Sequence, residues 1–170
     1  MNLARAASVL IGLGSNRGGP RARLEGAVRA LRADPDVVVT RVSPWYRTRP
    51  VGGPPGQPDY LNGVLAARTR LAPEGLLRRL QAIERSHGRD RAAEERNGPR
   101  TLDLDLLLYG DRTLELPGLV LPHPRLEERA FVLVPLADVA PERRLPRSGR
   151  TVREQLALVD TAGILEVVAG

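Results

Sequence analysis

Apolar residues recur along the first part of the chain at two spacings, one typical of strands and the other of helices. Strand-like runs or alternation lie at 8–13, 37–46, 60–71 and 102–108. Helical spacing lies at 20–35, where Pro20 suits the first turn, and again from Pro73 to Gly88, which suits a helix C-terminus. The pattern therefore predicts the order strand, helix, strand, strand, helix, strand.

This order is that of a ferredoxin-like α+β fold, an antiparallel sheet with helices packed on one face. Beyond it, the pattern predicts a C-terminal extension with helices near 127–137 and 151–158 and a short apolar end at 164–168. The sequence shows no internal repeat, low-complexity tract or linker. We therefore expect a single domain over residues 1–170.

Composition narrows the range of partners without choosing one. The 170 residues include 26 basic and 20 acidic ones, for a net charge of +6. All the basic residues are arginine, which suits bidentate contacts with phosphate and carboxylate. Anionic partners are therefore favoured, whether nucleotides, nucleic acids or membrane surfaces. The absence of cysteine excludes disulfides and thiolate metal sites.

The apolar run at 6–13 is short, is interrupted by glycine, and has no convincing cleavage site after it. We interpret it as a first strand rather than a signal peptide. No segment of the sequence approaches the length of a transmembrane helix. We therefore expect a soluble cytoplasmic protein.

Two aspartates, Asp103 and Asp105, interrupt the leucine-rich strand in GPRTLDLDLLLYG, residues 98–110. Side chains alternate faces along a strand, so both carboxylates point to one side, with Cα atoms roughly 6.5 Å apart. Such a pair, without clustered histidine or cysteine, suits Mg²⁺ shared with substrate phosphates. The alternative is a solvated strand face. Leu107 and Tyr109, expected to continue that face, and the poor fit of aspartate to strands argue against it.

The segment before this strand, HGRDRAAEERNGPR, is rich in arginine. It places four guanidinium groups within reach of the start of the strand: Arg89, Arg91, Arg96 and Arg100. Arginines beside a carboxylate pair suit phosphoryl transfer, in which metal ions hold the phosphates and guanidinium groups take up developing negative charge. Interleaved acids leave a solvated surface loop as the alternative, which would be preferred without the neighbouring aspartates.

Three other motifs are less specific. LPHPRLEERAF contains His123, which could donate to a phosphate or be structural. DYLNG puts Tyr60 and Asn62 on one strand face, where a ring and an amide can hold a flat heterocycle. GLGSNRGG lacks the third glycine of a dinucleotide-binding fingerprint and the lysine of a P-loop, so it predicts a plain turn.

Together, the motifs GLGSN, SPWYRTRPVG, PDYLNGV, IERSHGRDR, GPRTLDLDLLLYG and LPHPRLEERAFVLVPLADVAP resemble those of the hydroxymethyldihydropterin pyrophosphokinase family of folate biosynthesis. The resemblance covers nearly all of residues 9–141, in the family's order and spacing. It implies a ferredoxin-like fold and transfer of the β,γ-pyrophosphate of ATP to the hydroxymethyl group of 6-hydroxymethyl-7,8-dihydropterin, with release of AMP. The implied partners are ATP and the reduced pterin, with no nucleic acid, membrane or obligate protein partner.

The resemblance also implies roles for particular residues. Two Mg²⁺ ions are expected at Asp103 and Asp105, and catalytic-loop arginines at Arg89 and Arg100. Positions at the ATP site are matched by Gln81, Glu84, Arg91, Leu106, His123, Pro124 and Arg129. Positions at the pterin site are matched by Thr48, Val51, Tyr60, Asn62 and Phe131. A first-strand motif that we interpret as structural is matched by Gly12, Gly14 and Asn16. At Asn97, well-known members carry a tryptophan that closes over the substrate.

Three other functions stay open on the residues alone. An RNA-recognition module shares the element order and suits a basic chain, but YLNGVLAAR lacks the aromatic pattern of such modules. A kinase that moves a single phosphoryl group would use the same metals and arginines. A pterin-binding protein without catalysis would have no need of the aspartate pair.

Overall fold

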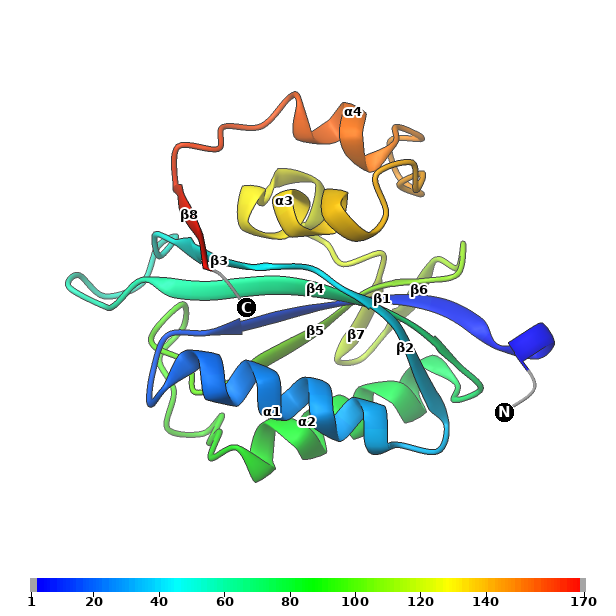
Figure 1. Ribbon diagram of the computed structural model, residues 1–170, viewed down its shortest axis with the longest axis horizontal. Helices are drawn as coiled ribbons and strands as arrows, with labels where there is room; N and C mark the ends of the chain where they lie inside the picture. The colour runs from blue at the N-terminus through cyan, green and yellow to red at the C-terminus, as the bar shows by residue number, and fades with distance from the viewer. Residues whose placement is uncertain (1–2, 169–170) are drawn as a thin grey trace.

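The computed structural model describes residues 3–168 and shows an antiparallel sheet between two layers of helices (Figure 1). In chain order the elements are η1 (Leu3–Arg5), β1 (Ala7–Ser15), α1 (Pro20–Ala33), β2 (Val37–Val42), β3 (Trp45–Thr48), β4 (Tyr60–Thr69), α2 (Pro73–Ser86), β5 (Asp103–Tyr109), β6 (Leu114–Leu116), β7 (Leu119–Leu121), η2 (Leu126–Glu128), α3 (Ala130–Val139), α4 (Val152–Leu156) and β8 (Ile164–Val168). The six elements predicted first are all present, with the second strand divided in two.

The main sheet has the strand order β5-β1-β4-β3-β8, and β2 also pairs with β4. All of these pairs are antiparallel. The break between β2 and β3 falls at Ser43 and Pro44, where proline has no N–H for a ladder. There the Ser43 hydroxyl accepts a hydrogen bond of 2.9 Å from the backbone N–H of Val64. With β2 and β3 taken as one interrupted strand, the order is that of a ferredoxin-like sheet, so the predicted fold is confirmed.

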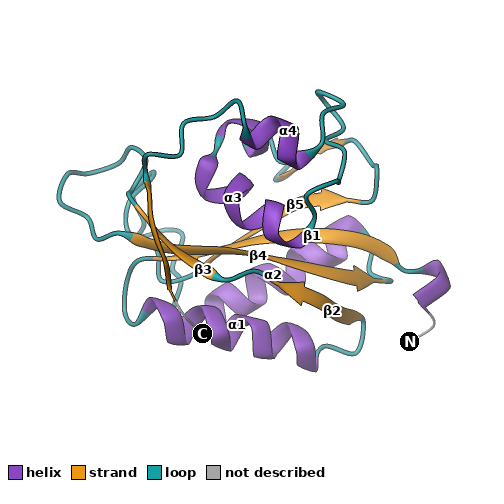
Figure 2. Cartoon of the chain, turned by 45° about the horizontal axis from the view of Figure 1, so that its top comes forward, coloured by secondary structure: helices purple, strands orange, loops and turns teal. Residues whose placement is uncertain are grey.

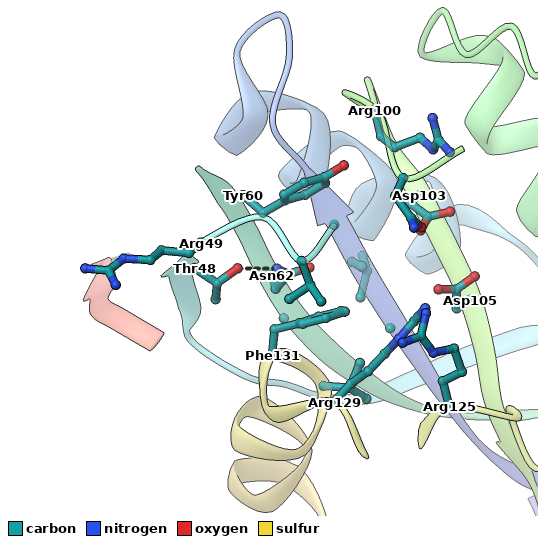
Figure 3. Close-up of a pocket in the computed structure, with 17 residues that line it drawn as sticks. Thr48, Arg49, Tyr60, Asn62, Arg100, Asp103, Asp105, Arg125, Arg129 and Phe131 are labelled. Atoms are coloured by element: carbon teal, nitrogen blue, oxygen red, sulfur yellow. Dashed lines mark hydrogen bonds between the residues drawn. The ribbon is translucent and has the colours of Figure 1, made fainter. Parts of the chain in front are cut away.

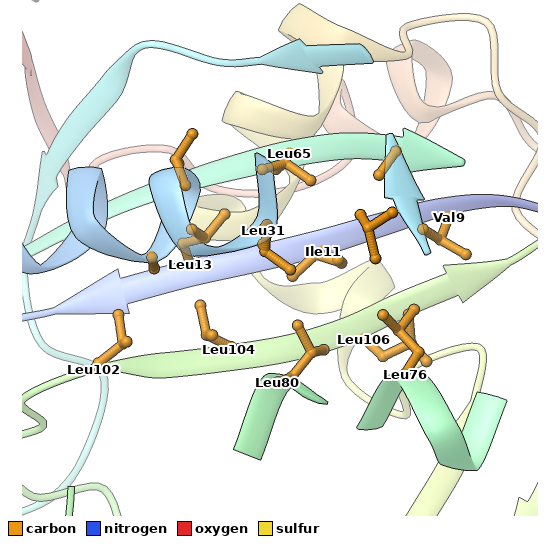
Figure 4. Packing of buried hydrophobic residues seen from close by; sticks show 14 of the residues in the cluster. Val9, Ile11, Leu13, Leu31, Leu65, Leu76, Leu80, Leu102, Leu104 and Leu106 are labelled. Atoms are coloured by element: carbon orange, nitrogen blue, oxygen red, sulfur yellow. The ribbon is translucent and has the colours of Figure 1, made fainter. Parts of the chain in front are cut away.

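Buried side chains form a separate core on each face of the sheet. On one face, Ile11 and Leu65 of the sheet pack with Leu31 of α1 and Leu80 of α2 (Figure 4). On the other face, Leu10, Val64 and Leu107 pack with Leu133 and Leu136 of α3. These belong to a second cluster. The expectation of helices on one face only is therefore wrong, because α3 and α4 cover the opposite face (Figure 2). Central strands that are apolar on both sides need cover on both.

Strand β5 contains a β-bulge at Leu107, which the register with β1 skips. Leu107 and Leu108 consequently both point into the core under α3, whereas Tyr109 lies in the core on the opposite face. The prediction that Leu107 shares the face of Asp103 and Asp105 is consistent with this core, and the same prediction for Tyr109 is wrong. A bulge adds a residue to one strand and so reverses the alternation beyond it.

The helix ends follow the sequence signals with one exception. Gly88, after α2, has φ 84°, the left-handed conformation expected at a helix C-terminus. Thr151 and Glu154 form a capping box at the start of α4. The helix expected near 127–137 is instead divided into η2 and α3 at Arg129, whose backbone is extended at φ −104° and ψ 104°. This break lets the Arg129 side chain line a cavity rather than continue a helix face.

Two further pairings were not predicted. Strands β6 and β7 form a hairpin around Gly118, which has φ 78°. Strand β8 pairs with β3, and the backbone N–H of Arg49 donates to the carbonyl of Gly163 at 2.9 Å. The chain thus returns from the α3–α4 layer to lie beside Thr48. Over residues 3–168, no helix has both the length and the apolar character needed to cross a membrane.

Candidate active site

A cavity opens where β1, β3, β4 and β5 meet the N-terminal end of α3 (Figure 3). It is lined by Gly12, Leu13, Gly14, Thr48, Arg49, Val51, Tyr60, Asn62, Gly63, Asn97, Arg100, Asp103, Asp105, Arg125, Arg129, Phe131 and Val132. The structure therefore brings together every predicted pterin contact, both aspartates, and two of the predicted arginines.

One half of the cavity is built around the buried amide of Asn62 on β4. Its Nδ2 donates a hydrogen bond of 2.8 Å to the Thr48 hydroxyl on β3. Its Oδ1 lies against Gly14, where an added Cβ would come within 2.6 Å of that oxygen. Gly14 is thus required as glycine by close packing, and the amide is held in one orientation. Tyr60 and Phe131 lie on opposite sides of Asn62 (Figure 3), an arrangement that suits a flat polar heterocycle.

The ring of Phe131 also faces a cation. The guanidinium carbon of Arg129 lies 5.4 Å from the ring centroid, within the range of a cation–π contact. Burial and the neighbouring Arg125 lower the pKa of Arg129, whereas Asp105 and Asp103 act in the opposite direction. Arg129 therefore connects the aromatic half of the cavity to the acidic half.

The other half of the cavity carries Asp103 and Asp105 on the same face of β5 (Figure 3). Burial, together with the charge of Asp103, raises the pKa of Asp105 to about 8. Two carboxylates this close repel each other unless a cation lies between or beside them. In the described part of the chain, no group of three or more histidine, cysteine, aspartate and glutamate side chains is placed to hold a metal. A cation here would therefore take most of its ligands from water and substrate oxygens, as Mg²⁺ commonly does.

Arg89 lies behind Asp103 and is only 9% exposed. Its Nη1 donates to Asp103 Oδ1 at 2.6 Å, to the carbonyl of Leu102 at 3.1 Å, and to Glu84. Burial alone would lower the pKa of Arg89, but Asp103, Glu84 and Glu94 together raise it above its usual value. Arg89 therefore does not line the cavity, but its hydrogen bond holds the carboxylate of Asp103 from the side away from the cavity.

Glu84, near the end of α2, is 1% exposed and joins three parts of the chain. Its Oε2 accepts from Arg89 and from the backbone N–H of Leu104 at 3.0 Å, and its Oε1 accepts from Arg91 Nη2 at 2.7 Å. Both carboxylate oxygens thus already have donors. Glu84 thus lies beneath the loop that carries Arg89 and Arg91 rather than in the cavity. Gln81, on the same helix, is also outside the cavity lining.

His123 and Pro124 lie beside the cavity lining. The Nδ1 of His123 accepts from the backbone N–H of Arg125 at 3.2 Å, which leaves the proton of the neutral ring on Nε2. Burial, and next the charge of Arg129, lower the pKa of His123 to about 4, so the ring is neutral at pH 7. The carbonyl of Pro124 accepts from Arg147 Nη1 at 3.1 Å. Leu106 differs from both, because its side chain is buried in the core under α1 and α2.

Three polar lining residues were absent from the predicted set: Arg49, Asn97 and Arg125. Arg125 belongs to the PHPR motif, residues 122–125, so the sequence offered a signal by which it could have been assigned to the site. Asn97 has φ 55°, and its backbone carbonyl accepts from Gln57 Nε2 at 3.0 Å. This bond joins the loop after β3 to the loop before β5. Asn16, interpreted as structural, supports the same junction: its Nδ2 donates to Pro58 at 2.9 Å and its Oδ1 accepts from the N–H of Arg100 at 2.8 Å.

A ferredoxin-like sheet whose cavity combines a carboxylate pair, arginines and an aromatic-walled polar slot defines an enzyme of the phosphoryl-transfer class. The sequence model of the family described as 7,8-dihydro-6-hydroxymethylpterin-pyrophosphokinase (HPPK) matches residues 10–141. The chain is 47% identical over 161 residues to 2-amino-4-hydroxy-6-hydroxymethyldihydropteridine pyrophosphokinase of Synechocystis, an alignment covering 95% of this chain and 80% of that one. It is 49% identical over 156 residues to the Pseudomonas aeruginosa protein of the same name, with coverage of 92% and 94%.

The chain therefore belongs to the HPPK family. It is a pyrophosphokinase of folate biosynthesis that transfers a pyrophosphoryl group to hydroxymethyldihydropterin. The resemblance stated from the motifs is thereby confirmed. Membership of the family also argues against the RNA-recognition module and the single-phosphoryl kinase.

Solved structures agree on the fold. The chain matches the Plasmodium falciparum HPPK-DHPS S436F/A437G/A613T triple mutant with STZ-DHP at a TM-score of 0.72, with 14% identity. It matches an HPPK-DHPS in complex with substrates at 0.69, with 13% identity. In both cases the alignment covers 90% of this chain but 43% of the other, so the chain spans less than half of those longer chains.

Proposed function

We propose that residues 1–170 form a single-domain enzyme that transfers the β,γ-pyrophosphate of ATP to the hydroxymethyl oxygen of 6-hydroxymethyl-7,8-dihydropterin. The observation that carries the proposal is the joining of two half-sites in one cavity. The slot between Tyr60 and Phe131 suits the pterin, and Asp103 with Asp105 suits a metal-bound polyphosphate. A substrate held in the slot has its substituent next to the aspartates, which is where an attacking hydroxyl is needed.

In the reaction we propose, the pterin oxygen forms a bond to the β-phosphorus of ATP while the bond from that phosphorus to the bridging α,β-oxygen breaks. The hydroxyl proton is released, and AMP leaves with the bridging oxygen. The protein supplies no nucleophile. Its contribution is to hold the two substrates in line and to exclude water, which can account for a large part of the rate of such a transfer.

The residues present suit Mg²⁺, for which we propose two ions at Asp103 and Asp105. The donor set supports this, since two carboxylates on the same face of β5 leave the remaining ligand positions for water and phosphate. When bound, the ions would neutralise the phosphates and polarise the reacting phosphorus. The same charge would remove the repulsion between the two aspartates.

The proposed roles of the arginines differ according to their positions. Arg100, in the cavity lining, and Arg89, behind Asp103, are assigned to the charge that develops on the pyrophosphate. Arg129 is assigned to the ATP phosphates. Pterin contacts are assigned to Thr48, Val51, Tyr60, Asn62 and Phe131. The remaining ATP-site assignments are Gln81, Glu84, Arg91, Leu106, His123 and Pro124.

Three of these ATP-site assignments take a particular form. Glu84 would act through the two arginines that it holds, because both of its oxygens already have donors. Leu106 would present its backbone, because its side chain is in the core. His123 would donate from Nε2, the nitrogen that carries its proton. The proposal places the enzyme in the cytoplasm, where ATP is available, with ATP and the pterin as partners rather than nucleic acid, a membrane or another protein.

A nucleotide assay tests this proposal. Purified protein with ATP and Mg²⁺ should give AMP only when the reduced hydroxymethyl pterin is added. Removal of the metal with a chelator should stop the reaction, and added Mg²⁺ should restore it. Formation of ADP would mean attack at the γ-phosphorus and would overturn the proposal, as would AMP formation that does not depend on the pterin.

A further inference from the structure

Glu94 bridges the two arginines that the proposed function assigns to catalysis. A single oxygen, Oε2, accepts from Arg89 Nε at 3.1 Å and lies 3.4 Å from Arg100 Nε. The Glu94 side chain is 12% exposed, and those of the two arginines are 5% and 16% exposed. The three charges therefore interact with little screening by solvent.

The two arginines depend on Glu94 to different degrees. Without it, Arg89 keeps the carboxylates of Glu84 and Asp103. Arg100 keeps only a hydrogen bond from Nη1 to the backbone carbonyl of Glu95 at 2.9 Å, among the side-chain contacts of the described chain. Arg100, the one of the two arginines that lines the cavity, is thus the one for which Glu94 is the main counter-ion.

The neighbouring Glu95 differs in its surroundings. It is exposed, and its carboxylate forms no ion pair within residues 3–168. Both glutamates carry the same charge on the same loop, so their long-range effects on an approaching polyphosphate are alike. Only Glu94 contacts the guanidinium groups directly, so only Glu94 can compete with bound phosphate for them.

We propose that Glu94 is a positioning residue that occupies Arg100 in the free enzyme, in the cavity where the transferred pyrophosphate would bind, and that pairs at the same time with Arg89 behind it. This rests on the proposed function of the two arginines. Glu94 keeps both guanidinium groups paired and oriented while no substrate is present. The phosphate oxygens of ATP then displace its carboxylate from Arg100, so part of the attraction for ATP is offset by loss of the existing ion pair.

The experiment is to measure binding of α,β-methylene ATP by calorimetry to the wild type, Glu94→Gln and Glu95→Gln. This analogue suits the test because the bond that breaks in the proposed reaction is replaced in it. We expect Glu94→Gln to bind about fivefold more tightly than the wild type, a change typical of losing one competing ion pair, and Glu95→Gln to stay within about twofold. The KM for ATP should fall in parallel in Glu94→Gln.

A double-mutant cycle separates direct contact from general loosening of the loop. In an Arg100→Ala background, Glu94→Gln should change the affinity for the analogue by less than about twofold, because the competing pair is already gone. If Glu94→Gln does not fold, Glu94→Asp replaces it, with a smaller gain in affinity because the shortened carboxylate holds Arg100 less well.

Unchanged or weaker binding of the analogue by Glu94→Gln would overturn the inference, as would an equal gain in Glu95→Gln or a full effect without Arg100. The binding readout needs no turnover. Pterin-dependent AMP formation together with unaltered binding by Glu94→Gln would therefore reject the role of Glu94 and leave the proposed reaction standing. Analogue binding without any AMP formation would instead reject the proposed reaction.

Discussion

The hydroxyl of Tyr60, at the start of β4, donates a hydrogen bond of 2.9 Å to the backbone carbonyl of Gly98, in the loop before β5. The Tyr60 side of the proposed pterin slot is thereby tied to the loop that carries Arg100. Burial raises the pKa of Tyr60, so its hydroxyl keeps the proton that this bond needs. A substitution at Tyr60, in the proposed pterin slot, can thus affect the position of the loop that carries Arg100.

Tyr60→Phe keeps the ring and removes only this tie. We expect the KM for the pterin to rise about threefold to tenfold, since a hydrogen bond contributes on the order of 1 kcal/mol. Steady-state kinetics with varied pterin measure the change. The matched control is Tyr46→Phe, which loses a hydrogen bond to Asp138 between β3 and α3, outside the cavity lining. That variant should melt at a lower temperature with its pterin KM unchanged, and an equal rise in both would refute the prediction.

Asp103→Asn and Asp105→Asn should each reduce AMP formation by at least about a hundredfold, because each removes a proposed metal ligand. Their stabilities should differ. Asp105→Asn removes a buried carboxyl group whose ionised form is disfavoured and should raise the melting temperature, whereas Asp103→Asn removes one of the three carboxylates paired with Arg89 and should lower it.

Asp111→Asn is the control for both variants, because Asp111 is almost fully exposed just beyond β5. It should retain full AMP formation. A variant at Asp105 that kept its activity would contradict the proposed metal site. Thermal melting shows whether a loss of activity comes from misfolding instead.

Gly14→Ala should damage the pterin slot, since the added Cβ would lie 2.6 Å from Asn62 Oδ1 and force the amide away from Thr48. We expect the pterin KM to rise about tenfold, in keeping with a displaced polar contact. Gly12→Ala, two residues away in the same strand and also in the cavity lining, provides the comparison. The nearest neighbour of its Cβ would be the Leu107 side chain at 3.5 Å, an ordinary contact, so the pterin KM of this variant should change little.

His123 gives a prediction for pH. Burial and Arg129 lower its pKa in the folded protein from 6.5 to about 4. Between these values the unfolded chain binds a proton that the folded protein does not, so the free energy of unfolding should fall as the pH falls from 6.5 toward 4. Denaturant unfolding at pH 7 and at pH 5.5 measures this. His123→Gln should lose less stability over that interval than the wild type does, and an unchanged difference would exclude His123 as a source.

Alternation along β4 was enough to predict that Tyr60 and Asn62 share one face of that strand. The same holds for Asp103 and Asp105 on β5, because the placement depends only on local geometry. Their meeting in one cavity followed from the ferredoxin-like order and the family resemblance. The reversal at Tyr109 could not be predicted, since the bulge at Leu107 arises from pairing with another strand.

Contacts between loops were also beyond prediction. Nothing in the spacing of HGRDRAAEERNGPR distinguishes Glu94 from Glu95, because a loop has no fixed period. Which of them meets Arg100 depends on the path of the whole segment. The second helix layer was missed for a related reason: α3 was expected, but its partner face was not, since the apolar residues of β4 serve two cores.

The pairing of β8 with β3 bears on how the protein can be extended or shortened. The strands are antiparallel, with Ile164 opposite Thr48 and Val168 opposite Trp45. The described chain therefore leaves the sheet about 10 Å from the cavity rim, given the rise of a strand. From Ile164 to Val168, β8 therefore runs away from Thr48, which lines the cavity. Truncation before Ile164 would expose the edge of β3 that carries Thr48, so β8 should stabilise this wall of the proposed pterin slot.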